Sequence, residues 1–273
     1  MTAALFRRTD EPNARASIPL WRGVDQVPAT FGPCVVMVGV FDGLHRGHRR
    51  LVDHARSISH DRGLPLLLVT FDPHPARVLG IDRDTSALST IAYRAELAAD
   101  AGVDAVCALR FTRELASWTP AEFAREVLAD GLRAAAVVVG ANFTFGARGA
   151  GTVDTLNELG RDLGFTTHGV PLLQVVDTPC SSTYTRRCLR VGDLAGAARA
   201  LGRPHRVDGH RLGDVVLLAD YTALPPTGRY RALVDDREGL VEIDADGRLR
   251  ILAGDPSPAG RPVTVAFLEH NEC

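Results

Sequence analysis

The stretch Gly39-Val40-Phe41-Asp42-Gly43-Leu44-His45-Arg46-Gly47-His48 decides the fold of this 273-residue chain. It follows an unbroken apolar run at residues 34–38, of the kind that forms a strand buried on both faces. After it, apolar residues recur at roughly helical spacing from Leu51 to Ile58. The ten residues are therefore predicted to form a strand-to-helix turn at the carboxyl end of a parallel strand, where open α/β sheets bind ligands.

This turn has the chemistry of a phosphate site. Gly43 and Gly47 leave the backbone bare where a phosphate would approach, and the start of the helix offers free N–H groups. His45 and His48 are three residues apart, so at a helix start they share a face and can donate hydrogen bonds to one anionic group. A His-x-x-His pair alone is more often surface decoration or half of a zinc site, but the sequence offers no further zinc ligands nearby.

Downstream of the turn, strand-like and helix-like segments alternate, which predicts a doubly wound parallel sheet of the α/β class. Thr119-Pro120-Ala121-Glu122 has the pattern of a helix start, with Thr as N-cap and Glu at the third helical position. A second buried strand is expected at residues 64–71, further strands at 103–111, 134–140 and 165–170, and helices at 90–101, 152–163, 182–190 and 193–201.

The pattern changes after residue 205. Short β-type runs separated by Gly, Pro and Asp occur at residues 214–218, 230–234, 239–243, 249–252 and 263–268. They indicate a small all-β module. We therefore predict an α/β domain over residues 1–190, a helical linker over 191–205 and the β module over 206–273.

Composition restricts the class of protein. An apolar fraction of 45% and a charged fraction of 23% are ordinary for a soluble globular chain, and a formal net charge of −2 gives no sign of a nucleic-acid or membrane partner. The five cysteines form no C-x-x-C pair, which fits a reducing compartment. The N-terminal residues have no apolar stretch of a signal peptide, and no segment approaches the ~20 apolar residues of a membrane span. We expect a cytoplasmic protein.

The ten-residue turn resembles the HxGH signature of the nucleotidyltransferase superfamily, in the form found in the prokaryotic bifunctional riboflavin kinase/FMN adenylyltransferases, or FAD synthetases. Three later motifs fall in that family's order: Phe71-Asp72-Pro73-His74-Pro75, the run from Gly140 to Gly146 that matches G-x-[DN]-F-x-F-G, and Ser181-Ser182-Thr183-Tyr184-Thr185-Arg186, which matches S-S-T-x-[IV]-R in part. The resemblance covers roughly residues 20–205. It implies a Rossmann-like HxGH nucleotidyltransferase domain over residues 1–190.

The resemblance also implies site residues. His45, His48 and Arg186 would be catalytic and act on the nucleotide phosphates. Nucleotide binding would fall to Gly39, Phe41, Asp42, Gly43, Gly47, Asn142, Ser182 and Thr183. Acceptor binding would fall to Phe71, Pro73, His74, Phe143 and Phe145. Mg²⁺ would be bridged by substrate phosphates and would have no assigned protein ligand.

Some of these residues could have ordinary structural roles instead. A serine at a helix start, such as Ser182, often only caps its own helix. The Phe71–Pro75 segment is, as bare sequence, a stiff proline turn. At least one of Phe143 and Phe145 is expected to fill the core instead of stacking on a ligand.

The chain departs from the family pattern in two places. Tyr184 stands where the family often has a second arginine, and Thr185 stands where it has an aliphatic residue. The kinase module of bifunctional members carries a P-T-x-N motif for Mg²⁺ and phosphate, and this sequence has no Pro-Thr-x-Asn. We therefore predict that residues 206–273 form a degenerate, reduced β-barrel-like remnant without riboflavin kinase activity, which packs on the catalytic domain and shapes the acceptor cleft.

The expected activity is transfer of the AMP moiety of ATP to the phosphate of FMN, giving FAD and pyrophosphate. Two alternatives stay open. The same chemistry could use CTP or another phosphorylated acceptor, as the change at Tyr184 suggests. The chain could instead be a flavin- or nucleotide-binding regulator without turnover, although the intact histidine pair argues against it.

Overall fold

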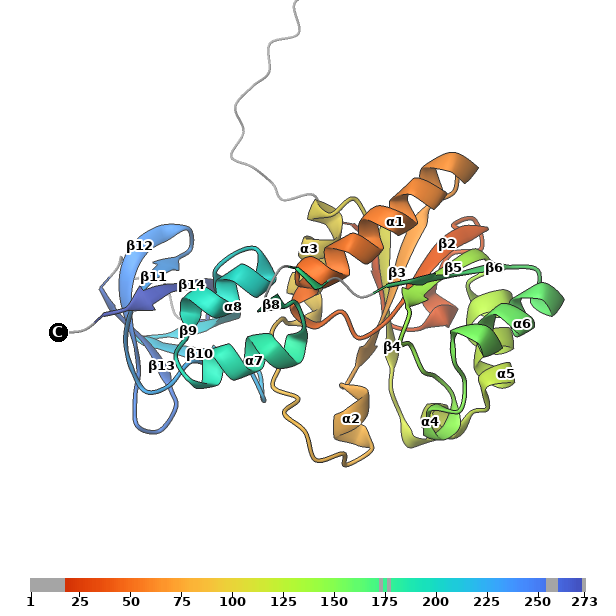
Figure 1. The fold of residues 1–273 in the computed structure, drawn as a ribbon. Coiled ribbons are helices and arrows are strands. Elements are labelled where there is room, and N and C mark those ends of the chain that lie inside the picture. Colours follow the sequence, from red (N-terminus) through yellow and green to blue (C-terminus); the bar gives the residue numbers. More distant parts are fainter. Residues whose placement is uncertain (1–17, 172–173, 176–177, 254–259, 272–273) are drawn as a thin grey trace, which may run out of the picture.

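The apolar run before the turn is the central strand of a parallel sheet. A computed structural model describes residues 18–171, 174–175, 178–253 and 260–271. In its first domain six strands pair in the order β1-β4-β3-β2-β5-β6, and every pairing is parallel (Figure 1). The strands are β1 (Leu20–Trp21), β2 (Cys34–Val38), β3 (Leu66–Asp72), β4 (Ala105–Arg110), β5 (Ala134–Gly140) and β6 (Thr166–Val170). The predicted parallel sheet is confirmed.

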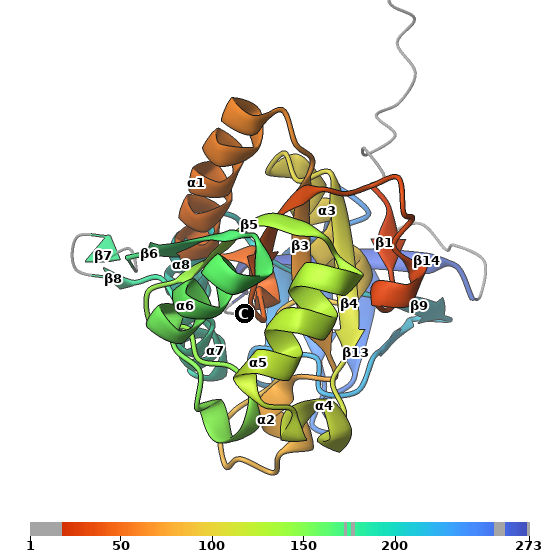
Figure 2. The ribbon, with the colours of Figure 1, turned by 90° about the vertical axis from the view of Figure 1, so that its right-hand side faces the viewer.

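Side chains of β2 alternate between two cores, as the period of a strand requires. Cys34, Val36 and Val38 pack toward α5 and α6, whereas Val35 and Met37 pack toward α1 and α3. Figure 2 shows α5 and α6 on the opposite side of the sheet from α1. The helices of this domain are α1 (Arg46–Arg62), α2 (Pro75–Val78), α3 (Ile91–Asp100), α4 (Arg113–Ser117), α5 (Pro120–Phe123), the π-helix η3 (Ala124–Gly131) and α6 (Val153–Leu163).

The start of α5 matches a local prediction from the sequence. The Thr119 side chain accepts from the backbone of Glu122, whose side chain accepts in return from Thr119, so the predicted capping box is present at α5. Within the described ranges, no helix combines the length and apolarity needed to cross a membrane.

The strand order reverses at β2. The chain runs outward from β2 to β3 and β4, and then returns to place β5 on the other side of β2. The switch point therefore lies between β2 and β5, and the Gly39–His48 turn leaves the sheet at that point. Ligands of doubly wound sheets bind in the crevice at such a switch point.

The second domain is a closed antiparallel barrel with the strand order β10-β13-β12-β11-β14-β9. Its strands are β9 (His205–Leu212), β10 (Val215–Leu218), β11 (Gly228–Val234), β12 (Arg237–Ile243), β13 (Leu249–Ala253) and β14 (Pro262–His270). The sequence predicted five of these strands and missed β9, because its outward positions are polar and leave no apolar run. That strand closes the ring, since it pairs with both β10 and β14.

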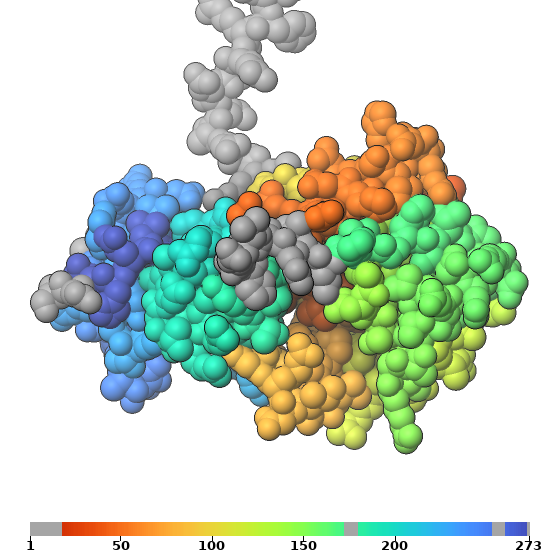
Figure 3. Space-filling view, viewed as in Figure 1, coloured from red at the N-terminus to blue at the C-terminus, as the bar shows by residue number. Residues whose placement is uncertain are grey.

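Two helices join the domains. Helices α7 (Ser182–Arg190) and α8 (Leu194–Leu201) pack on each other, and α8 contacts β9 and β14 of the barrel. A short hairpin of β7 (Gln174–Val175) and β8 (Thr178–Pro179) precedes them. The helix pair fills the space between the sheet domain and the barrel (Figure 3).

The segment between α2 and α3 connects the sheet domain to the barrel by packing and by backbone hydrogen bonds. Leu88 is 2% exposed and belongs to the same hydrophobic cluster as the barrel interior. The neighbouring Ala87 forms an isolated parallel bridge with the barrel loop after β10: its N–H donates to Tyr221 O (2.6 Å), and the N–H of Ala223 donates to Ala87 O (2.9 Å). The two domains therefore share both backbone hydrogen bonds and apolar core.

Replacing Leu88 tests this junction. Leu88→Ala should lower the free energy of unfolding by about 3 kcal/mol, because it leaves a cavity in a shared core. Urea unfolding followed by far-ultraviolet circular dichroism measures the loss. Leu79→Ala is the matched control, since Leu79 is 50% exposed and should cost little. A loss below about 1 kcal/mol at Leu88 would mean that the site collapses or that the junction is not packed.

Candidate active site

The turn that leaves β2 has an unusual backbone. Phe41, Gly43 and Leu44 have φ values of 49°, 73° and 34°, in the left-handed region that favours glycine. A Cβ on Gly43 would lie 2.9 Å from the Cβ of Leu88, so both the backbone angle and the close packing require glycine there. The Gly43 N–H donates to Ser89 Oγ (3.0 Å). The structure thus gives Gly43 a packing role, while its predicted contact with a nucleotide stays a prediction.

The two histidines of the turn are stacked. His45 is the N-cap of α1, and its Nδ1 accepts from the His48 N–H at 3.3 Å. The ring centroids are 3.6 Å apart with an interplanar angle of 19°, and the Phe41 and His48 rings make a T-shaped contact with their centroids 5.1 Å apart. The Nδ1 atom of His48 is buried and has no hydrogen-bond partner among the described residues. The Nε of Arg133 and the Nδ1 of His205 are buried and unpaired in the same way, so this state does not by itself mark a ligand contact.

Both histidines are neutral at physiological pH. Burial lowers the pKa of His45 to about 4, against the opposing charge of Asp42. Burial and the neighbouring His45 hold the pKa of His48 well below its usual range. Because His45 Nδ1 accepts a hydrogen bond, its proton lies on Nε2. The pair therefore offers hydrogen-bond donation to an anion without carrying charge.

Charge near the turn is concentrated on one buried ion-pair network. The Asp42 carboxylate is 2% exposed. It accepts from Arg94 Nη2 at 3.1 Å and from Arg186 Nη2 at 2.5 Å. The backbone N–H groups of Leu88 and Ser89 also donate to it, each at 3.1 Å. A buried carboxylate is tolerated only with such full pairing, so Asp42 joins the turn to α3, to α7 and to the segment that reaches the barrel.

Arg94 was not among the predicted site residues. It is 5% exposed, and its Nη1 donates to Val40 O (2.9 Å) and Thr70 Oγ1 (2.7 Å). The sequence contains a signal for it: Arg94 shares a helix face with Leu97 and Ala98, both of which are buried. A cation on an apolar helix face indicates a buried anion elsewhere in the chain.

The Ser181–Arg186 motif at the start of α7 contacts the Gly39–His48 turn. Arg186 is 3% exposed, and besides Asp42 it binds Ser86 O through Nε at 2.6 Å. Ser182 Oγ donates to the backbone carbonyl of Asp42 at 3.0 Å. Thr183 and Asn142 are both exposed. The structure therefore brings Ser182 and Arg186 to the turn, while their predicted roles toward a nucleotide, and those of Thr183 and Asn142, stay predictions.

The predicted acceptor residues lie in two places. The Phe71–Pro75 segment leaves β3 through a cis Asp72–Pro73 peptide, and His74 caps α2 by accepting from the Ala76 N–H at 3.1 Å. Burial, with a further contribution from Arg186, lowers the pKa of His74 to about 4. Phe143 and Phe145 stack at 5.5 Å, and Phe145, at 7% exposed, packs in the core behind β5.

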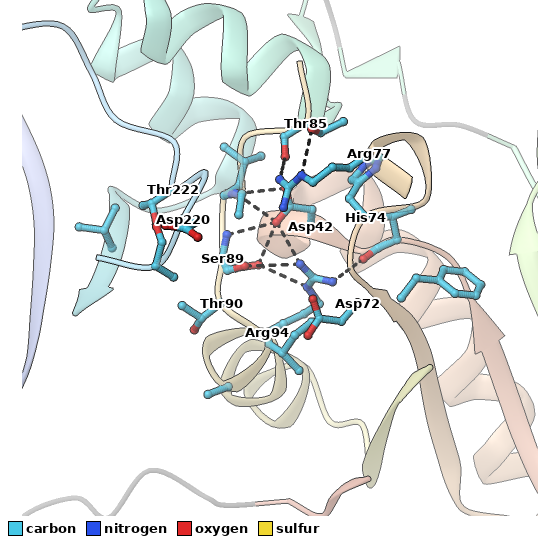
Figure 4. A pocket seen from close by; sticks show the side chains of 18 of the residues that line it. Asp42, Asp72, His74, Arg77, Thr85, Ser89, Thr90, Arg94, Asp220 and Thr222 are labelled. Carbon is cyan, nitrogen blue, oxygen red and sulfur yellow. Dashed lines mark hydrogen bonds and ion pairs between the residues drawn. The ribbon is translucent and has the colours of Figure 1, made fainter. Parts of the chain in front are cut away.

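A pocket of about 300 Å³ lies beside the turn (Figure 4). Val40, Asp42, Phe71 and His74 line it from the sheet domain, and barrel residues line its opposite side. His45, His48 and Asn142 are not among its lining residues. The pocket thus joins the end of β2 and the predicted acceptor loop to the barrel.

No three His, Cys, Asp or Glu side chains of the described residues gather closely enough to hold a metal ion.

Comparison with known proteins identifies the family. Residues 27–184 match the family model for FAD synthetase. The chain belongs to the FAD synthetase family. It is accordingly a nucleotidyltransferase, and the predicted resemblance is confirmed.

Within the FAD synthetase family, the chain is similar to bifunctional riboflavin kinase/FMN adenylyltransferases. The protein from Pseudomonas fluorescens is 33% identical over 240 residues, which cover 84% of this chain and 74% of that protein. The Escherichia coli K12 protein is 32% identical over 176 residues, 64% of this chain and 56% of that protein. The match thus spans between about half and three quarters of these relatives.

A solved structure shows the same fold. It is titled a macrolide-efflux protein from Streptococcus pneumoniae, with a TM-score of 0.76 at 22% identity, and the match covers 94% of this chain and 91% of that one. At this identity the likeness concerns the fold alone.

The buried network makes a stability prediction. Asp42→Asn should lower the free energy of unfolding by about 3–5 kcal/mol, because it leaves two buried guanidinium groups without their anion. Urea denaturation measures the change. Asp72→Asn is the matched control: its ion pair with Arg22 is exposed at the surface, and such pairs contribute about 0–1 kcal/mol. Equal losses in the two variants would contradict the assignment of Asp42 as the buried hub.

The buried histidines make a pH prediction. Their folded-state pKa lies below that of the unfolded chain, for His45 and His74 at about 4, so between about pH 6.5 and pH 4 the unfolded chain binds more protons. The free energy of unfolding should therefore fall as the pH drops through this window, which urea titrations at a series of pH values measure. His48→Gln should reduce the slope, whereas His60→Gln, at a side chain 91% exposed, should not. Parallel curves for wild type and His48→Gln would contradict the prediction.

Proposed function

We propose that this chain transfers the AMP moiety of ATP to FMN, giving FAD and pyrophosphate. One observation carries the proposal: a stacked histidine pair at the switch point, in which His45 Nδ1 caps α1 and leaves the Nε2–H of the neutral ring to donate. In the reaction a phosphate oxygen of FMN bonds to the α-phosphorus of ATP. The bond from that phosphorus to the bridging oxygen of the β-phosphate breaks, and pyrophosphate leaves.

Such a transfer needs positioning and charge stabilisation more than covalent help from the protein. His45 Nε2–H is available to donate to a phosphate oxygen, because its Nδ1 is occupied by the cap of α1. Phosphate at this point would also face the N-terminus of the 17-residue helix α1, whose dipole favours an anion. Mg²⁺ would arrive with ATP as part of the substrate complex and keep several waters.

The barrel supports the further proposal that riboflavin kinase activity is lost. Leu212 pairs directly with Val215, so the β9–β10 connection has only Gly213 and Asp214. The Asp214 carboxylate binds Arg250 Nη1 at 2.9 Å, and its carbonyl accepts from the Ile251 N–H at 2.8 Å. This is the place where the family's phosphate-binding loop is expected, and a tight turn held at both ends leaves no loop for Mg·ATP. We accordingly assign residues 1–190 to the transferase, 191–205 to a linker and 206–273 to a barrel without kinase activity.

Pyrophosphate release tests both proposals. With Mg·ATP the full chain should release pyrophosphate when FMN is supplied and none when riboflavin is supplied, and chromatography should show FAD. His48→Ala should lower kcat by about 10²–10³-fold, the usual cost of removing one donor to a transition-state oxyanion. His60→Ala, whose wild-type side chain is 91% exposed, is the control and should keep full activity.

The two alternatives give different results in the same assay. Pyrophosphate release with CTP in place of ATP, or with another phosphorylated compound in place of FMN, would mean that the chemistry is kept and the substrate differs. Tyr184→Arg would then be the variant to make. Tight FMN binding with no pyrophosphate from any pair would indicate a regulator. FAD formation from riboflavin and ATP alone would overturn the loss of kinase activity.

A further inference from the structure

The pocket beside the turn is built by both domains. The sheet domain supplies Phe71, Asp72 and His74 on one side, and the barrel supplies Ala219, Asp220 and Thr222. Figure 4 shows the segment that carries Thr85, Ser89 and Thr90 between these two sides, with Asp42 and Arg94 between that segment and the side of His74 and Asp72. The pocket volume of about 300 Å³ is at the lower end of the range for small-molecule sites.

The barrel loop at this pocket is firmly held. Its Thr222 Oγ1 donates to Ala219 O within the loop at 2.7 Å, and backbone hydrogen bonds join it to Ala87 at 2.6 and 2.9 Å. From the barrel side, His205 Nε2 lies 2.8 Å from Ala223 O. A loop with this many fixed points keeps its backbone in place without a ligand, which lowers the entropy cost of binding.

A stacking contact joins the two sides of the pocket. The Arg77 guanidinium, on the helix that follows the predicted acceptor loop, lies 3.9 Å from the ring centroid of Tyr221 in the barrel loop. The same guanidinium donates to Thr85 O at 2.7 Å. Because α2 contacts the barrel loop in this way, the predicted acceptor loop and the barrel loop are positioned together.

Most charges of the pocket are already paired. Asp42 binds Arg94 and Arg186, Asp72 binds Arg22, and Arg206 binds Glu96 and Asp208. Among the described lining residues, Asp220 is the carboxylate for which no hydrogen bond or ion pair is present. On the other side, His74 is neutral, and its Nδ1 accepts from Ala76, so its proton is on Nε2. The pocket thus offers a free acceptor on the barrel side and a neutral donor on the sheet side.

We propose that the barrel completes the acceptor site: the heteroaromatic ring of the acceptor lies in this pocket, and Asp220 accepts a hydrogen bond from a ring N–H. The inference rests on the proposed function. It fits the flavin ring system, whose pyrimidine portion carries one N–H between two carbonyl oxygens. Apolar lining from Phe71 and Val207 suits the ring faces. A barrel without a kinase site would then serve as a specificity element for the transferase.

Binding and turnover of the full chain test the proposal separately. Quenching of flavin fluorescence without ATP should give a Kd for FMN that rises roughly 10- to 100-fold in Asp220→Ala, the usual cost of one hydrogen bond to a charged group. Asp220→Asn, which keeps an acceptor oxygen, should bind with intermediate affinity. Riboflavin should show the same ratio as FMN, because Asp220 contacts the ring and not the phosphate. In turnover, KM for FMN should rise while kcat and KM for ATP stay within twofold.

A second variant tests the barrel side of the pocket by filling it with a larger side chain. Ala219→Trp should fill the pocket from an exposed loop position and weaken FMN binding at least as much as Asp220→Ala. Leu212→Trp, at a barrel residue 56% exposed and outside the pocket, is its control, and Asp246→Ala, with a side chain 73% exposed, is the control for Asp220.

The outcomes separate the two proposals. Unchanged flavin affinity in both pocket variants, with normal pyrophosphate release, would overturn the barrel inference and leave the proposed function standing. Weakened affinity without pyrophosphate release in the wild type would support the inference and overturn the function. An effect of Asp220→Ala on FMN but not on riboflavin, or no flavin binding by the wild type, would also overturn the inference.

Discussion

The Asp42 carboxylate is the constraint on which the rest of the structure depends. It lies at the end of the central strand, 2% exposed, with Arg94 from α3 on one oxygen and Arg186 from α7 on the other. A carboxylate removed from water is stable only if nearly all its lone pairs are used, so every element that reaches it must adopt one position. The strand, two helices and the segment around Leu88 are therefore located by a single group.

This constraint connects the barrel to the histidines. The N–H of Leu88 donates to Asp42, while its side chain packs with the barrel interior. Asp42 in turn belongs to the same short 3₁₀ turn that precedes His45. A displacement of the barrel loop would thus reach the turn through backbone hydrogen bonds and one buried leucine. The geometry of the histidine pair depends on contacts from the second domain, although the second domain contributes no residue to that pair.

Much of this architecture follows from local sequence patterns. Continuous apolar runs identified β2, β3, β4 and β5, because strands buried on both faces cannot be polar. The features that the sequence did not reveal depend on long-range pairing. In β9 apolar and polar residues alternate, so the strand is recognisable only from its pairing with β10 and β14. Arg94 is a single cation in a helix, and its role is clear only once its partner Asp42 is known. Arg186 shows the same limit, since its spacing fits either a phosphate or a buried carboxylate, and in this structure it meets Asp42.

The bridge between Ala87 and Thr222 has a consequence for biosynthesis. The two residues are far apart along the chain, so when the sheet domain leaves the ribosome the barrel loop does not yet exist. Contacts of such long sequence separation form late, because chain entropy opposes them until both partners are made. Leu88 then exposes to water the side chain that it later buries in the barrel. We therefore expect the nascent sheet domain to hold the Gly39–His48 turn loosely and to reach its final geometry only after the last strand of the barrel has been synthesised.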